Sequence, residues 1–316
     1  MQRLAVVLFN LGGPDSPAAV RPFLFNLFRD PAIIGLPNPL RWLVARMISG
    51  RRAPVAREIY AKIGGKSPLL EHTRQQSSAL QQLLRDDCGN AVEVFVAMRY
   101  WHPFAAETAR AVQRFAPDRV VLVPLYPQYS TTTTGSSIDD WHRAAAEVGL
   151  TTPTSAVCCY PTEVGFIAAH ARRVGQAWRD ATMGGAKARI LFSAHGLPRK
   201  VVARGDPYQW QIEQSAAAVV EALAPVEVDW VVCYQSRVGP LEWIGPYTDA
   251  EITRAGRDGV PVIVVPIAFV SEHSETLVEL DVEYRRLAEA QGVPSYVRVP
   301  TVGTSPSFIR GLADLV

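Results

Sequence analysis

The chain of 316 residues is longer than one hydrophobic core normally supports, so we expect two domains. Its composition, 48% hydrophobic and 20% charged, is that of a folded globular protein rather than a disordered one. With 32 Lys and Arg against 30 Asp and Glu, the net charge of +2 excludes the strongly basic surface of a typical nucleic-acid-binding protein. We therefore expect no nucleic acid among its partners.

Six short apolar runs rich in β-branched residues predict strands. They lack the alternation of a half-exposed strand, which indicates burial on both faces and parallel pairing. In chain order they begin at Leu4, Val92, Arg119, Arg189, Val228 and Pro261. Amphipathic segments lie among them and predict helices, most clearly at 71–86, 104–116, 165–181 and 209–223.

Alternating strands and helices predict βαβ units with right-handed crossovers. The first three and the last three strands are separated by roughly residues 140–165, which indicates two α/β domains, each a parallel sheet flanked by helices. We place the N-terminal domain at 1–150, the C-terminal domain at 151–303 and a last helix at 304–316. Ligands of such folds bind beyond the carboxyl ends of the strands, so we expect the site in a cleft between the domains.

The residues that follow the predicted strands are unusually polar and aromatic. We expect nine of them to converge on one opening: Arg99, Tyr100, Tyr126, Tyr129, His195, Gln235, Trp243, His273 and Glu275. His195 is the sharpest candidate among these residues, because a histidine near carboxylates can hold a divalent metal or relay protons.

An acidic segment follows the sixth strand. Glu275, Glu279 and Glu283 recur at four-residue intervals, where like charges on a helix repel by about 0.2–0.5 kcal/mol per pair. Two interpretations remain open: a solvated helix face opposite an apolar one, or a row of carboxylates that serves a cation. A wider turn, as in a π-bulge, would bring the three carboxylates closer into line.

The segment from 21 to 52 is crowded with Phe, Leu, Ile and Trp, interleaved with Arg and almost free of acid. It predicts either a core helix pair with a loop or an exposed apolar lip with a basic rim. An exposed lip would suit a membrane interface or a flat anionic ligand.

The four cysteines show no metal-ligand spacing. Cys158 and Cys159 lie in an apolar run that predicts a strand, so we expect buried thiols in a reducing compartment. The apolar start of the chain is too short for a transmembrane helix and lacks a signal-peptide cleavage site, which favours a cytoplasmic location.

Several motifs in order, covering nearly the whole chain, resemble the ferrochelatases, which insert ferrous iron into porphyrin late in haem synthesis. They are "LFNLGGP", "YAKIGGKSP", "RYWHP", "LYPQYSTTTTGSS", "SAHGLP", "YQSRVGPLEWIGP" and "PIAFVSEHSETLVELDVEY". The resemblance implies two Rossmann-like domains that grip the porphyrin in a cleft between them.

The resemblance also implies site residues. His195 matches the essential histidine and Glu275 its acidic partner, both as metal ligands, with His273 beside them in catalysis. Glu279 and Glu283 match a metal and proton path on a helix with a π-turn. The implied porphyrin contacts are Leu11, Arg52, Tyr60, Ser67, Arg99, Tyr100, Tyr126, Gln235 and Trp243, of which Arg52, Tyr60 and Ser67 match propionate-contacting positions.

The implied reaction is the insertion of Fe2+ into protoporphyrin IX to give protohaem. Leu11 stands where the coproporphyrin-using branch typically has Tyr, which favours protoporphyrin. The alternatives are a coproporphyrin ferrochelatase, another tetrapyrrole metal chelatase such as a cobalt-inserting enzyme, or a non-catalytic tetrapyrrole-binding protein. Fe2+ is then a substrate, and no permanently bound cofactor is expected.

Some members of the family carry a C-terminal cysteine cluster that holds an iron–sulfur centre. This sequence lacks those cysteines, so we expect no such cluster. We also expect a monomer that touches the inner face of the membrane peripherally through the lip.

Overall fold

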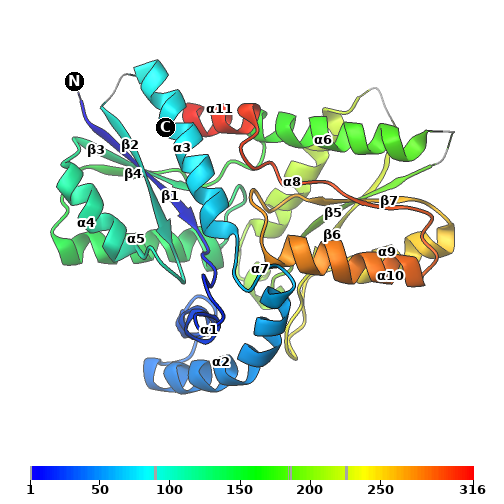
Figure 1. The fold of residues 1–316 in the computed structure, drawn as a ribbon, viewed down its shortest axis with the longest axis horizontal. Coiled ribbons are helices and arrows are strands. Elements are labelled where there is room, and N and C mark those ends of the chain that lie inside the picture. The colour runs from blue at the N-terminus through cyan, green and yellow to red at the C-terminus, as the bar shows by residue number, and fades with distance from the viewer. Residues whose placement is uncertain (1, 89–90, 184, 186, 225–226) are drawn as a thin grey trace. The chain divides into compact units, whose positions relative to one another are not determined.

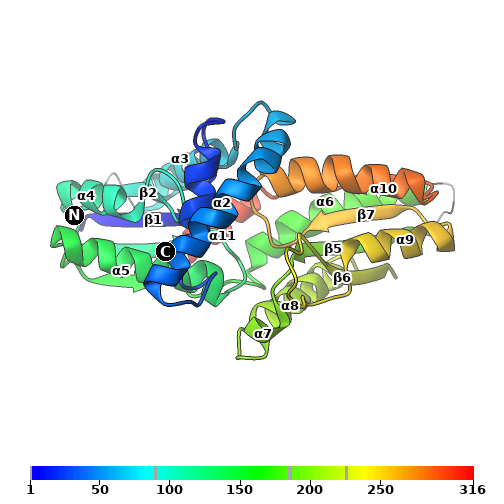
Figure 2. The ribbon, with the colours of Figure 1, turned by 90° about the horizontal axis from the view of Figure 1, so that it is seen from below.

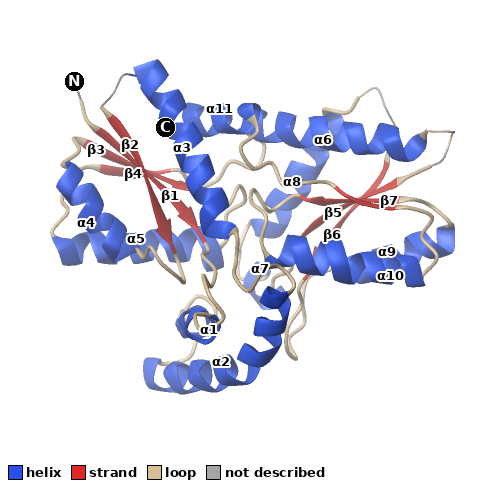
Figure 3. Cartoon of the chain, in the orientation of Figure 1, coloured by secondary structure: helices blue, strands red, loops and turns tan. Residues whose placement is uncertain are grey.

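The computed structural model describes residues 2–88, 91–183, 185, 187–224 and 227–316, except the side chain of Cys88. The chain divides into two compact units. The first unit comprises Met1–Cys159 with Leu312–Val316, and the second comprises Tyr160–Gly311. Each unit has strands at its centre and helices around them (Figure 1, Figure 3).

The first unit contains a parallel four-stranded sheet in the order β2-β1-β3-β4. Its strands are β1 (Leu4–Asn10), β2 (Val92–Met98), β3 (Arg119–Pro124) and β4 (Thr154–Ala156). Its helices are α1 (Val20–Arg29), α2 (Asn38–Ala61), α3 (Leu69–Cys88), α4 (Ala105–Phe115), the π-helix η1 (Thr131–Gly135) and α5 (Ser136–Val148).

Alternation along β1 explains how this sheet is covered on both faces. Val7 and Phe9 point to one face, where they pack against Ala109 of α4 and Trp141 of α5. The neighbouring residues of β1 point to the other face and are also fully buried. Helix α3 packs along β2, and α1 and α2 pack against each other beside the sheet (Figure 2).

The second unit repeats the same strand order, as β6-β5-β7-β8. Its strands are β5 (Arg189–His195), β6 (Asp229–Gln235), β7 (Val262–Pro266) and β8 (Tyr296–Arg298). Its helices are α6 (Val164–Thr182), α7 (Arg199–Val202), α8 (Tyr208–Glu221), α9 (Thr248–Asp258), the π-helix η2 (Glu275–Glu283), α10 (Tyr284–Ala290) and α11 (Pro306–Asp314), whose last residues belong to the first unit. In Figure 1, α6 lies above the strands and α9 and α10 lie below them.

The six predicted strands are confirmed, and β4 and β8 are additions of three residues each. A strand that short carries no readable hydrophobic pattern. Burial on both faces holds for β1, β3, β5 and β7, but it is wrong for β2 and β6. These two strands lie at sheet edges, where some of their side chains are partly exposed to solvent.

The expectation for the vicinal cysteines is wrong. Strand β4 ends at Ala156, so Cys158 and Cys159 follow it in a loop, where Cys158 is exposed and Cys159 is partly exposed. The pairing of β4 with β3 also carries the first unit past residue 150 to Cys159.

His170 is an unusual member of the second unit's core. It is fully buried on α6 beside Phe166, and neither ring nitrogen has a hydrogen-bond partner among the described residues. Burial, aided by the charge of Arg173, lowers the pKa of His170 to about 3. The folded protein therefore holds this imidazole neutral.

We expect the buried imidazole to make the protein acid-sensitive. The unfolded state binds the proton near pH 6.5 and the folded state only near pH 3, so stability falls by about 1.4 kcal/mol per pH unit below 6.5. Urea unfolding from pH 8 to pH 4 should show this decline reduced in His170→Leu and unchanged in His142→Gln, which alters an exposed histidine. Parallel pH profiles for His170→Leu and the wild type would contradict the expectation.

Candidate functional site

His195 is the last residue of β5, where the strand reaches the carboxyl edge of the second sheet. Its Nδ1–H donates to the carbonyl oxygen of Gly196 at 2.6 Å, which fixes the neutral tautomer. In the neutral ring the lone pair is on Nε2, which lies 3.9 Å from Oε1 of Glu275. Both side chains are about one-third exposed, at 37% and 30%, so an incoming molecule can reach part of each.

Trp243 lies beside this histidine. The two ring centroids are 6.1 Å apart, and the indole N–H donates to the carbonyl of Val238 at 3.1 Å. Gly196 permits the approach, because a Cβ there would lie 3.2 Å from both the Trp243 ring and the Gln235 carbonyl. The Trp243 ring therefore lies next to the His195 ring.

His273 has the opposite tautomer. The backbone N–H of Glu275 donates to its Nδ1 at 3.1 Å, so in the neutral ring the proton is on Nε2. Burial lowers the pKa of His273, although the nearby carboxylates of Glu275 and Glu272 oppose the shift. The ring is thus a neutral donor, and His195 is the better candidate for a metal ligand or proton acceptor.

The acidic segment is a π-helix, η2, as the wider-turn interpretation expected. Its three glutamates differ in their surroundings. The Glu275 side chain is 30% exposed, both carboxylate oxygens of Glu279 accept hydrogen bonds, and Glu283 is exposed. Of the three carboxylates, that of Glu283 therefore has the most contact with solvent.

Four donors hold Glu279. The backbone N–H of Ser236 donates to Oε1 at 2.9 Å and its hydroxyl donates to Oε2, while Gln235 Nε2 and the Tyr284 hydroxyl complete the set at 3.2 and 3.1 Å. Ser236 turns into the left-handed region, φ 64°, to present both groups. Burial and the Glu275 charge raise the pKa of Glu279.

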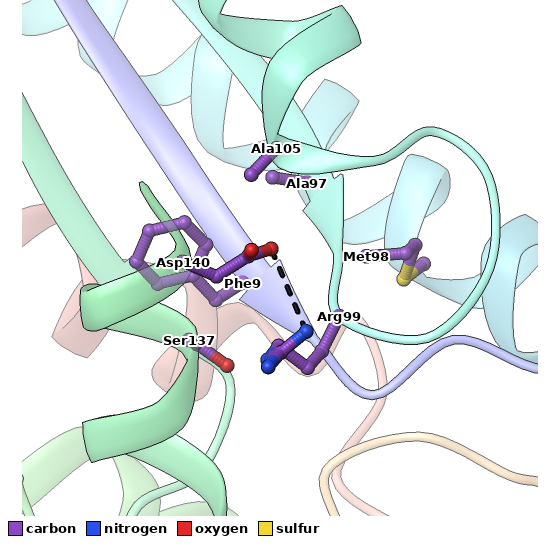
Figure 4. A pocket seen from close by; sticks show the side chains of 7 residues that line it. All are labelled: Phe9, Ala97, Met98, Arg99, Ala105, Ser137 and Asp140. Carbon is purple, nitrogen blue, oxygen red and sulfur yellow. Dashed lines mark ion pairs between the residues drawn. The ribbon is translucent and has the colours of Figure 1, made fainter. Parts of the chain in front are cut away.

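A second polar cluster lies in the first unit, at the carboxyl ends of β1 and β2. Arg99 donates from Nη2 to Asp30 Oδ2 at 2.7 Å and from Nε to the Ser136 hydroxyl at 2.7 Å. Its Nη1 lies 3.6 Å from Asp140, and this pair lines a recess with Phe9 (Figure 4). The Arg99 side chain is 18% exposed, and its guanidinium donates to protein acceptors, which hold it in one position.

Asp30 is the centre of this cluster. The hydroxyls of Tyr100 and Ser136 also donate to Oδ2, at 2.8 and 2.5 Å, and the backbone N–H of Ala32 donates to Oδ1. Burial, followed by the Asp30 charge, raises the pKa of Tyr100, so the phenol stays a donor.

The other predicted residues of the first unit are distributed more widely. Leu11 and Tyr60 pack in one apolar cluster with Tyr100, and Tyr60 is 8% exposed. Arg52 is exposed on α2. Ser67 lies against Gly13, where an added Cβ would be 2.5 Å from the serine side chain.

Tyr126 lies in the sheet's core cluster as a partly buried member, and burial raises its pKa. It follows β3, two residues beyond the strand end, as the sequence predicted. Its hydroxyl oxygen is enclosed and has no hydrogen-bond partner among the described residues.

Sequence reasoning missed Asp30, Ser136, Ser236 and Tyr284. Asp30 had a signal, because it is the single acid between residues 21 and 52. Ser236 had none, because its role depends on a left-handed backbone that the sequence does not indicate.

The lip is exposed, as the second interpretation of this segment expected. Leu40, Trp42, Leu43 and Met47 on α2 are between 44% and 59% exposed, and Arg46 stacks over the Trp42 ring at 5.5 Å. Its α1 side is buried instead, through Phe23 and Leu24. Within the described ranges, no helix is both long and apolar enough to cross a bilayer.

Comparisons with a protein-family model and with known proteins identify the same family. The family model named Ferrochelatase matches residues 3–316. The chain is 58% identical to a ferrochelatase of Caulobacter vibrioides over all of this chain and 90% of that protein. It is 52% identical to a ferrochelatase of Wolbachia from Drosophila simulans over 98% of both chains.

Among solved structures, SirB from Bacillus subtilis with Fe3+ has a TM-score of 0.56 at 12% sequence identity. The match covers 99% of this chain and 94% of that chain. At this identity the likeness concerns the fold alone, and it confirms the chelatase-like α/β architecture.

Replacement of Asp30 by Asn should destabilise the protein by about 2 kcal/mol, because Arg99 keeps only the more distant carboxylate of Asp140 and the Tyr100 and Ser136 hydroxyls lose their charged acceptor. Urea unfolding at pH 7 measures the loss. The control Asp15→Asn, at an exposed position, should change stability by less than about 0.5 kcal/mol. Equal losses of stability in the two variants would show that Asp30 does not stabilise the cluster around Arg99.

Proposed function

This chain belongs to the ferrochelatase family, the lyases that insert iron into protoporphyrin in haem biosynthesis, and on that premise we propose that His195 and Glu275 perform the insertion. The observation that carries the proposal is the tautomer of His195. Its Nδ1–H is bonded to a carbonyl oxygen, which leaves Nε2, 3.9 Å from Oε1 of Glu275, as the nitrogen that can accept a proton or bind iron.

The chemistry explains why such a pair is needed. A free porphyrin carries two pyrrole protons in its plane, and the incoming Fe2+ is hydrated, so the protein must accept protons and replace water ligands. We assign proton acceptance to Nε2 of His195 and iron capture to Glu275. His195 can bind iron through the same lone pair only while Nε2 carries no pyrrole proton. His273 acts beside them as a neutral donor through Nε2–H.

Glu279 and Glu283 are proposed as the path for iron inward and protons outward. The raised pKa of Glu279 brings the carboxyl closer to the pH of the cell, where gain and loss of a proton cost little. The exposure of Glu283 gives the path an end in solvent.

The porphyrin contacts are proposals as well. Trp243 offers a flat apolar face beside His195, and the exposed guanidinium of Arg52 can pair with a propionate. We assign further contacts to Leu11, Tyr60, Ser67, Arg99, Tyr100, Tyr126 and Gln235. Arg99 would act as a fixed wall, since its donors already bond Asp30 and Ser136.

The lip is proposed to rest on a membrane surface. Apolar side chains on α2 with arginines among them match the chemistry of an interface with anionic lipid headgroups. We further propose a cytoplasmic monomer without an iron–sulfur cluster, so that the purified protein should show no iron–sulfur absorption in the visible spectrum.

An anaerobic assay tests the site assignment. Purified protein, Fe2+ and protoporphyrin should lose free-porphyrin fluorescence as haem forms, and His195→Ala or Glu275→Ala should lower kcat by about 100-fold or more. The control His142→Ala should retain the wild-type rate. Normal turnover by His195→Ala would refute its role, and faster turnover of coproporphyrin would favour the coproporphyrin branch.

A vesicle assay tests the lip. Co-sedimentation with vesicles that contain phosphatidylglycerol should fall about tenfold or more when Leu40, Leu43 and Met47 are all changed to Ser, because apolar area that enters the interface is lost. Val164→Ser with Met183→Ser, at exposed apolar positions of the second unit, is the matched control. Wild-type protein that stays in the supernatant would contradict the proposal.

A further inference from the structure

A buried arginine of the second unit, not assigned so far, bonds one acid just before η2 and a second acid within it. Arg298 is the last residue of β8 and pairs in register with Val264 of β7. Its side chain is 9% exposed. A cation this buried needs counter-charges within hydrogen-bond reach.

Two carboxylates meet that need. Arg298 donates from Nη1 to Oε1 of Glu272 at 2.6 Å. Its Nε donates to Oδ1 of Asp281 at 2.9 Å, and its Nη2 donates to Oδ2 of the same carboxylate. The planar fork of a guanidinium is suited to this two-sided grip, since one edge takes Asp281 and the remaining nitrogen takes Glu272.

Glu272 depends strongly on this arginine. The backbone N–H of Thr301 donates to the same Oε1 at 2.9 Å, whereas Oε2 is enclosed without a hydrogen-bond partner among the described residues. Burial alone would raise the pKa of Glu272, but the Arg298 charge and hydrogen bonds to the carboxylate lower it below its usual value. Removal of Arg298 would leave the partly buried carboxylates of Glu272 and Asp281 without this counter-charge.

The segment between Glu272 and Asp281 contains residues to which the proposed function assigns the chemistry. Glu272 directly precedes His273 and lies three residues before Glu275, and Asp281 lies two residues after Glu279. Most of this stretch is π-helical. A π-helix is rare because its local geometry is unfavourable, so tertiary contacts must hold it.

We propose that Arg298 is a positioning residue for iron insertion: by gripping Glu272 and Asp281 it sets where the His273 ring and the Glu275 carboxylate lie. This inference rests on the proposed function, which gives His273 and Glu275 their roles in iron insertion. Arg298 itself acts through Glu272 and Asp281 and not on the substrate. Residues that orient a metal ligand from behind typically change metal affinity or activity by about 10–100-fold when they are removed.

The second unit offers a matched control in Arg189. It is equally buried, with 8% side-chain exposure, and it also bonds two acids, Asp229 at 2.8 Å and Asp258 at 2.7 Å. It lies at the start of β5, whereas His195 ends the same strand, about 20 Å further at the usual rise per residue. Loss of either arginine breaks a two-acid ion pair, but only one of these pairs holds η2.

The test compares Arg298→Met and Arg298→Lys with Arg189→Met and Arg189→Lys in the full chain. For each variant, melting by circular dichroism is recorded first, and all assays run below the lowest melting temperature. The anaerobic insertion assay then gives kcat and KM for Fe2+, and fluorescence quenching gives the Kd for protoporphyrin. His195→Ala and Glu275→Ala are run alongside.

We expect Arg298→Met to lower kcat/KM for Fe2+ by about tenfold or more, with the protoporphyrin Kd changed by less than about twofold. Arg298→Lys should recover part of the loss, since an ammonium keeps the charge but cannot grip both acids. Arg189→Met should melt lower than the wild type yet insert iron at close to the wild-type rate.

The inference is overturned if folded Arg298→Met keeps wild-type kcat/KM for Fe2+, or if Arg189→Met loses as much. If Arg298→Met does not fold, Arg298→Lys and Asp281→Asn decide by the same criteria. Turnover retained by His195→Ala and Glu275→Ala would reject the proposed roles, and the Arg298 inference with them. Turnover lost in those two variants but kept in Arg298→Met rejects the Arg298 inference alone.

Discussion

Where the central strands of a parallel sheet are buried on both faces, reactive side chains find room beyond the carboxyl ends of those strands, and each unit has a polar cluster there. In β1 and β5 nearly every residue is buried, and the polar residues Asn10 and His195 stand at the carboxyl ends of the two strands. The position of the chemistry thus follows from the burial of the sheet.

Polar groups at such an edge still need partners, because a buried carboxylate or cation without one is costly. Asp30 in the first unit gathers Arg99, Tyr100 and Ser136 on one carboxylate oxygen. Glu279 in the second unit gathers four donors. These bonds fix side chains that loops alone would leave free to rotate.

Each unit also contains a π-helix near its polar cluster. The segment η1 ends directly before Ser136, which bonds Arg99, and η2 begins at Glu275. Because a π-turn is unfavourable locally, its presence indicates that tertiary contacts outweigh helix preference at these positions. Arg298 supplies such contacts for η2, and it does so from a strand of three residues that carries no visible pattern in the sequence.

The sequence by itself determined the six long strands, the main helices and the family, because hydrophobic period and ordered motifs are properties of the chain. It also located His195 and the row of glutamates. Only the tertiary structure decided which histidine nitrogen is free, that Glu279 is held by Ser236, and that Arg298 pairs with Glu272 and Asp281. These facts depend on backbone angles and on contacts between residues distant in the chain. No local pattern encodes them, since the partners of such a hydrogen bond are 44 or 26 positions apart in the chain. They meet only once the sheet has formed.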